Sequence, residues 1–230
     1  MKKPYVSKLK RVGEFKVFLV NGEYIRANID EEFTNFGQHY RFSFIPEMEF
    51  WIDKGASIRE QNFYISHLII EHSLMSKGIK YSKAIEKADR LEKIGRLKSE
   101  YFKKLKKVPF NEVLKKVHKK FLKKYSGKVK VWIVRGEIVR DLYFIDFTEG
   151  GHDRVYDFVP KGEIWLDDDL SKRERKFVLL HELHERNLMA NKKMNYDDAH
   201  HSSSILEYFC RKHPKELKKY LKKEFEILKN

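Results

Sequence analysis

The chain contains one sequence twice. Residues 16–75 align without a gap with residues 130–189, and 22 of these 60 positions are identical. After one inserted residue the match resumes, with Tyr81 facing Tyr196. Unrelated segments of this length share only a few identities, so we interpret the chain as a tandem duplication of one module.

Each copy has the pattern of an α+β module. In the first copy, the first apolar run breaks at Asn21–Gly22, a pair typical of a β-hairpin turn. Another apolar run lies at Phe42–Ile45 and a further one around Trp51, and two helical patterns follow. We therefore expect each copy to form a small antiparallel sheet followed by a helical hairpin. The copies are expected to pack about a pseudo-twofold axis, so that a monomer acts as a pseudo-dimer.

Most of the net charge lies between the copies. The chain carries +15, and Lys93 to Lys130 contains 15 basic residues but only two acidic ones. Apolar residues at helical spacing on both sides of Pro109 predict two amphipathic helices with lysine-rich outer faces, the second reaching Leu122. The expected organisation is a first α+β module over 1–92, a basic helical connector over 93–129 and a second α+β module over 130–230.

The connector lysines have two interpretations. They form either a solvated surface that confers solubility or a face that binds nucleic acid without sequence preference, through attraction to phosphates. A membrane surface is a third option, but these faces lack the tryptophan that interfacial helices favour. The candidate nucleic-acid-binding residues are Lys103, Lys104, Lys106, Lys107, Lys115, Lys116, Lys119, Lys120, Lys123 and Lys124.

Composition limits the setting of the protein. No apolar run approaches the roughly 18 residues of a membrane span, so no membrane partner is expected. The single cysteine, Cys210, excludes an intramolecular disulfide and favours a cytoplasmic location. Abundant lysine and glutamate are also typical of thermophilic proteins.

The stretch "FVLLHELHERNLM" has the residue types of a metal site. His181 and Glu185 are four residues apart, so a helix places them on one face. A second helix is predicted after Asn195, a good N-cap, and it carries His200 and Glu207 on one face. If the helices pack antiparallel, these four side chains meet. They suit a divalent metal, with zinc favoured, or iron or manganese if the coordination expands.

The segment "EIWLDDDLSKRERKFVLLHELHE" resembles the core of zincin-type metallopeptidases, in which a helix carries H-E-x-x-H. The resemblance covers under a quarter of the chain. It implies that His181 binds the metal and that Glu182 is the general base. Glu185 stands where the family has its second histidine, and His200 or Glu207 would complete the ligands. We expect Glu182 to face solvent beside the metal. Glu207 is either the fourth ligand or the partner that holds a ligand histidine. The implied activity is metal-dependent hydrolysis, including that of a peptidase.

The first copy offers an internal comparison. It keeps His67, Glu71 and Glu92, but Leu68 replaces the proposed base and Ile85 the second proposed histidine ligand. If the second copy is catalytic, the first is a degenerate partner. Alternatively, the His-x-x-x-Glu pair is a buried structural hydrogen bond in both copies. The chain would then be a non-enzymatic duplicated module that binds nucleic acid through its lysine-rich helices.

Three other features concern the proposed site or possible alternatives to it. His184 and Tyr196 are candidate oxyanion donors beside the proposed site. Cys210 lies near a histidine in sequence but is interpreted as a free core thiol. Asp167–Asp169 lacks the glycine and distal glutamate of a calcium loop and is interpreted as a polar turn.

Overall fold

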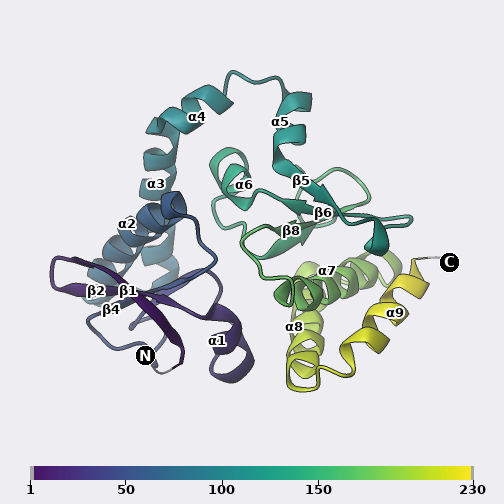
Figure 1. The fold of residues 1–230 in the computed structure, drawn as a ribbon, viewed down its shortest axis with the longest axis horizontal. Helices are drawn as coiled ribbons and strands as arrows, with labels where there is room; N and C mark the ends of the chain where they lie inside the picture. Colours follow the sequence, from purple (N-terminus) through teal and green to yellow (C-terminus); the bar gives the residue numbers. More distant parts are fainter. Residues whose placement is uncertain (1–2, 229–230) are drawn as a thin grey trace. The chain divides into compact units, whose positions relative to one another are not determined.

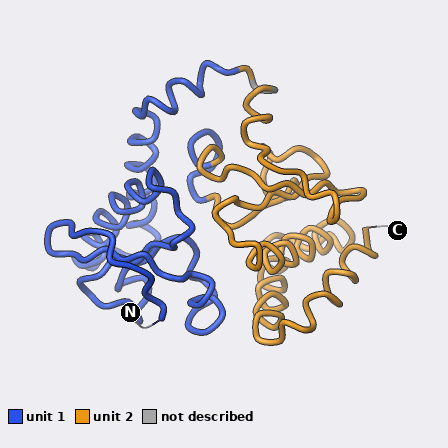
Figure 2. Tube along the Cα trace, in the orientation of Figure 1, with its two compact units in different colours: residues 1–108, 140–146 blue, residues 109–139, 147–230 orange. Residues whose placement is uncertain are grey.

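The computed structural model describes residues 3–228 of the chain. The chain divides into two compact units, each assembled from two separate segments (Figure 2). Unit 1 comprises residues 1–108 and 140–146, and unit 2 comprises residues 109–139 and 147–230. The fold is α+β, with two four-stranded sheets that are each followed by helices (Figure 1).

The elements follow one another in nearly the same order in both halves. The first half contains β1 (Tyr5–Val12), β2 (Phe15–Val20), α1 (Gly22–Asn28), β3 (Phe36–Gln38), β4 (Glu49–Asp53), α2 (Ile58–Met75), α3 (Tyr81–Lys98) and α4 (Glu100–Leu105). The second half contains α5 (Phe110–Val117), β5 (His118–Phe121), a 3₁₀ turn η1 (Lys123–Tyr125), β6 (Lys130–Val134), α6 (Gly136–Leu142), β7 (Gly150–His152), β8 (Glu163–Asp167), α7 (Glu174–Asn191), α8 (Tyr196–Lys212) and α9 (Leu217–Ile227).

The two sheets share one strand order and one register. Their orders are β1-β2-β4-β3 and β5-β6-β8-β7. Phe18 pairs with Trp51 in the first sheet, and Trp132 pairs with Trp165 in the second. The inner pairs β2–β4 and β6–β8 are parallel, whereas the outer pairs are antiparallel. The expectation of an antiparallel sheet was therefore wrong for the central strands.

Asn21–Gly22 begins a helix and is not a hairpin turn. The Asn21 side chain accepts a hydrogen bond from the amide of Tyr24 and so caps α1, which leads away from β2. Gly22 is required by a close approach, because a Cβ there would lie 1.9 Å from Oδ2 of Asp53. The same crowding recurs at Gly136. A crossover helix after β2 allows the next long strand, β4, to run parallel to it.

The expected strand at Phe42–Ile45 is also absent. These residues lie in turns, where the backbone amide of Ile45 donates to the carbonyl of Phe42. Both side chains are buried, and the ring of Phe42 packs on Gly37 of β3. The apolar run is therefore a buried loop, which shares one core cluster with Phe18 of β2 and Trp51 of β4. Trp51 does lie in a strand, β4, as expected.

The basic connector forms more than two helices. Helix α3 continues to Lys98, and the short α4 follows it. Helix α5 starts after Pro109 but ends at Val117, so the expected continuation to Leu122 was wrong. The chain instead enters β5, which pairs with β6 at the edge of the second sheet. Because β5 has only four residues, the spacing of its apolar residues does not distinguish a strand from the continuation of a helix.

In unit 2, α7 packs against β7, β8, α8 and α9. Its buried apolar residues join those of β6 and β8 in the main core of the unit, which includes Val131, Ile164, Leu166, Phe177, Leu180 and Leu183. No helix among residues 3–228 is long and apolar enough to cross a membrane.

Candidate metal centre

Two helices of unit 2 bring the predicted residues together. Helix α7 carries His181 and Glu185, and α8 carries His200 and Glu207. Helix α8 begins as expected at Asn195, whose side-chain oxygen accepts from the amide of Asp198 at 2.9 Å. The small residues Ala199 and Ser203 on α8 are buried, which allows α7 to approach closely.

Three ligand atoms converge between these helices. Nδ1 of His200 lies 2.8 Å from Oε2 of Glu185 and 3.1 Å from Nε2 of His181. The same Nε2 lies 3.4 Å from Oε2 of Glu185. Two imidazole nitrogens and one carboxylate oxygen suit zinc, and three protein ligands leave one position of a tetrahedron open. The residues present therefore fit a divalent ion.

Glu207 lies behind His181. Its Oε2 is 2.9 Å from Nδ1 of His181, and its Oε1 accepts from the guanidinium of Arg211 at 2.6 Å. Burial raises the pKa of Glu207, but the hydrogen bond of His181 and the charge of Arg211 outweigh it and hold the pKa at about 2. Both oxygens are therefore engaged, and Glu207 holds a candidate ligand instead of facing the three converging atoms.

Glu182 is buried, so the expectation that it faces solvent was wrong. Only 8 % of its surface is exposed, because α7 lies close to β7 at this point. A Cβ on Gly150 of β7 would lie 3.0 Å from Oε1 of Glu182. Burial and the charge of Glu185 raise the pKa of Glu182 well above its ordinary value. Glu182 is thus a buried carboxyl group that lies among other ionisable side chains, including Glu185 and His152.

His152 was not predicted, yet it is part of the cluster. It is fully buried at the end of β7, and its Nε2 lies 2.9 Å from Oε1 of Glu185. Together with Glu182 and Glu185 it forms a second group whose ligand atoms lie within 4.8 Å of one another. The sequence repeat held the relevant signal, because His152 aligns with Gln38 of the first copy.

Unit 1 has the same framework without the converging ligands. His67 contacts Glu71 at 3.3 Å and Glu92 at 3.0 Å. Burial lowers the pKa of His67, but the hydrogen bonds and charges of Glu71 and Glu92 outweigh it and raise the pKa to about 9. Leu68 is fully buried where unit 2 has Glu182, and Ile85 is half-buried where it has His200.

A buried arginine supports the framework in both units. In unit 2, Arg211 joins Glu174 at the start of α7 to Glu207 on α8, with shortest distances of 2.8 and 2.6 Å. The equivalent residues of unit 1 are Arg96, Glu60 and Glu92, joined at 2.7 and 2.8 Å. This network is present in unit 1 although Ile85 stands where unit 2 has His200.

The two candidate oxyanion donors differ in position. His184 is held by Glu224 of α9 at 2.9 Å and by Ser202 at 3.2 Å, so it ties helices together. The ring of Tyr196 stacks on that of His200, with centroids 5.3 Å apart. Burial and the charges of Glu185 and Glu182 raise the pKa of Tyr196 to about 12, so its hydroxyl keeps its proton.

The structure confirms the buried position expected for Cys210 and places Asp167–Asp169 at the end of β8 and in the turn after it. Cys210 is fully buried, and burial raises the pKa of its thiol to about 11, which makes it an inert core residue. In the Asp167–Asp169 segment, Oδ1 of Asp167 accepts from the amide of Asp169, and Asp168 pairs with Lys119. The segment is thus a polar turn, although its three carboxylates lie close together.

The ten connector lysines are exposed but do not lie in one unit. Four belong to α4 and the following turn of unit 1, and six belong to α5, β5 and η1 of unit 2. Lys103 and Lys115 pair with acidic residues three positions earlier. Lys119 and Lys120 lie on β5, an edge strand, where lysine also discourages pairing with another chain.

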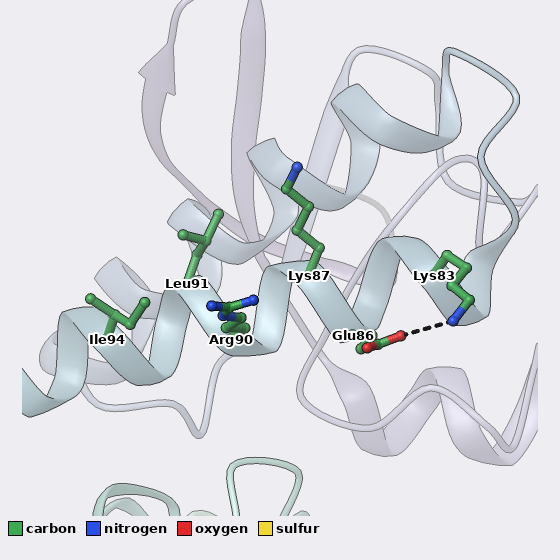
Figure 3. A pocket seen from close by; sticks show the side chains of 6 residues that line it. All are labelled: Lys83, Glu86, Lys87, Arg90, Leu91 and Ile94. Carbon is green, nitrogen blue, oxygen red and sulfur yellow. Dashed lines mark hydrogen bonds and ion pairs between the residues drawn. The ribbon is translucent and has the colours of Figure 1, made fainter.

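The surface recess in Figure 3 is separate from the His–Glu cluster. It runs along α3 of unit 1 and is lined by Lys83, Glu86, Lys87, Arg90, Leu91 and Ile94. None of the predicted site residues lines it.

Comparisons with known proteins found no matching family model, no matching curated protein and no matching solved structure.

Proposed function

We propose that unit 2 is a zincin-like, metal-dependent hydrolase whose ion is held by His181, Glu185 and His200. The observation that carries the proposal is the convergence of their three ligand atoms, with every pair 3.4 Å or less apart. Two imidazoles and a carboxylate are the ligands of catalytic zinc in some peptidases. Zinc is therefore the favoured ion, with iron and manganese as alternatives.

Glu182 is the proposed general base, and Tyr196 the proposed oxyanion donor. A bound zinc ion would polarise a carbonyl group and acidify a water molecule. Positive charge at the three donor atoms would also lower the raised pKa of Glu182, so that its carboxylate could accept a proton. Tyr196 stacks beside His200 and stays protonated, as a hydrogen-bond donor must.

Elemental analysis of the purified protein is the first test, and we expect one equivalent of zinc, iron or manganese. His181→Ala should lose both the metal and hydrolysis of labelled casein. Glu182→Gln should keep the metal and slow hydrolysis by roughly 100-fold or more. His67→Ala, the same change in unit 1, is the matched control and should alter neither the metal content nor the hydrolysis of casein. Folded wild-type protein without stoichiometric metal would contradict the proposal.

The proposal includes a history for the chain. Two copies arose by tandem duplication, and the first lost the base and one ligand at Leu68 and Ile85. Support comes from the shared strand order, the shared register and the repeated arginine network. We further propose that the protein acts as a monomer in which the two units form a pseudo-dimer. A location in the cytoplasm is proposed as well, since the single cysteine is a buried free thiol.

A second proposed function is non-specific binding of nucleic acid, because all ten connector lysines are exposed. Replacing Lys103, Lys104, Lys106 and Lys107 with glutamine should weaken retention on heparin and reduce the salt dependence of binding. The control removes the same charge from Lys215, Lys218, Lys219 and Lys222, which are also exposed. Equal retention of the two variants would show that only net charge matters.

A further inference from the structure

We infer that His152 is a positioning residue that donates a hydrogen bond from Nε2 to Glu185, and that it is not a metal ligand. Its role rests on the proposed function, because Glu185 is a proposed ligand. His152 lies in neither predicted helix and comes instead from β7 of the sheet. Its ring therefore reaches Glu185 from the sheet, whereas His200 reaches it from α8.

The backbone fixes which nitrogen of His152 carries the proton. The amide of Arg154 donates a hydrogen bond to Nδ1 of His152 at 3.1 Å. A ring nitrogen that accepts a hydrogen bond is unprotonated, so the proton of the neutral ring is on Nε2. That nitrogen is buried and lies 2.9 Å from Oε1 of Glu185, within reach of a hydrogen bond, but the contact does not have hydrogen-bond geometry in the structure. A protonated nitrogen has no lone pair for a metal.

Unit 1 contains the same arrangement with a residue whose roles are unambiguous. The amide of Tyr40 donates to Oε1 of Gln38 at 2.7 Å. Nε2 of Gln38 then donates to Oε1 of Glu71, also at 2.7 Å. Both acceptor and donor recur at the 114-residue spacing of the repeat, with His152 in place of Gln38. An amide nitrogen only donates, so this position is built to hold the glutamate of the helix.

The inferred hydrogen bond would give the two oxygens of Glu185 different roles. Oε1 faces His152, whereas Oε2 faces His200 and His181. Glu185 would therefore bind an ion through one oxygen while the other is held by the sheet. A second ion among His152, Glu182 and Glu185 is disfavoured, because it would need a lone pair on Nε2 and the loss of the Arg154 hydrogen bond.

The test compares His152→Gln with His152→Leu in the full chain, using titration with zinc alone. The glutamine variant imports the unit 1 residue, so its zinc affinity should stay within about threefold of wild type. The leucine variant should bind zinc about 10- to 100-fold more weakly, the usual effect of losing a partner of a ligand. A glutamine variant that loses zinc as fully as His181→Ala would overturn the inference. So would wild-type protein with two equivalents of zinc and a glutamine variant with one.

A measurement on wild-type protein separates this inference from the proposed function. Nitrogen-15 NMR of the zinc-free protein, at a pH where the His152 ring is neutral, should show the proton on Nε2. A proton on Nδ1 would overturn the inference whether or not the protein binds metal. If zinc does not bind but the proton is on Nε2, the proposed function fails and the hydrogen-bonding role stands.

Discussion

Nδ1 of His181 lies 2.9 Å from Oε2 of Glu207. The other ring nitrogen, Nε2, is therefore the one that faces His200 and Glu185. A carboxylate behind a histidine fixes the ring orientation and raises the basicity of the nitrogen that binds metal. The same relationship joins His67 to Glu92 at 3.0 Å in unit 1, where no second histidine faces the ring.

Glu207→Gln should weaken zinc binding about 10- to 100-fold without abolishing it, because the amide holds His181 less strongly than a carboxylate does. Isothermal titration with zinc measures the change. Glu92→Gln makes the equivalent change in unit 1 and should leave zinc affinity unaltered. Complete loss of zinc in a folded Glu207→Gln protein would instead place Glu207 among the direct ligands.

Placing the missing imidazole in unit 1 should create a second, weaker metal site. Ile85→His restores the residue that aligns with His200, and His67 and Glu71 are already 3.3 Å apart. We expect the ratio of zinc to protein to rise from one to two at saturating zinc. Ile85→Gln supplies a polar side chain of similar size without an imidazole and should leave the ratio at one. An unchanged ratio in folded Ile85→His protein would contradict a common ancestral site.

The two buried arginines should be critical for stability. Arg96→Met and Arg211→Met each leave carboxylates without their partner in a buried network, which costs about 3–5 kcal/mol of unfolding free energy. Urea denaturation at neutral pH measures this loss. Arg90→Met changes an exposed position of α3 and should alter stability by no more than about 0.5 kcal/mol. Similar small effects at all three positions would argue against the network.

The stability of unit 1 should fall in mild alkali. The pKa of His67 is raised to about 9 in the folded protein, above its ordinary value near 6.5. The protonated form is thus favoured by folding, and its contribution is fully present below pH 6.5 and lost as the pH rises through 9. The loss is at most about 3 kcal/mol. NMR titration of His67 gives its pKa, and unfolding measured at pH 7 and pH 10 gives the loss relative to His67→Gln.

The helices were predictable because their signals are local. The spacing of His181 and Glu185 fixed one shared face, and Asn195 marked the start of the next helix. Helix packing then followed from the small residue Ala199, which is fully buried at the crossing. None of these inferences required knowledge of the sheet.

The part of the candidate site that comes from strand β7 could not be predicted from helical spacing. His152 lies 33 residues before Glu185, and only the fold of β7 beside α7 brings them together. The burial of Glu182 also depends on that strand, because Gly150 allows the sheet to approach α7 closely. Helical periodicity does not specify this distance. Asn21–Gly22 illustrates a different limit, because the same pair can turn a hairpin or cap a helix.

The discontinuous sequence of unit 1 has a consequence during synthesis. Residues 140–146 complete this unit, and within it Glu60 and Arg96 contact Arg140 and Asp141. A nascent chain that has reached residue 108 therefore holds a buried carboxylate and guanidinium whose remaining partners have yet to be translated. We therefore expect the first half of the protein to mature only after residues 140–146 have been synthesised, and a stop codon between the repeats to release an incompletely folded polypeptide.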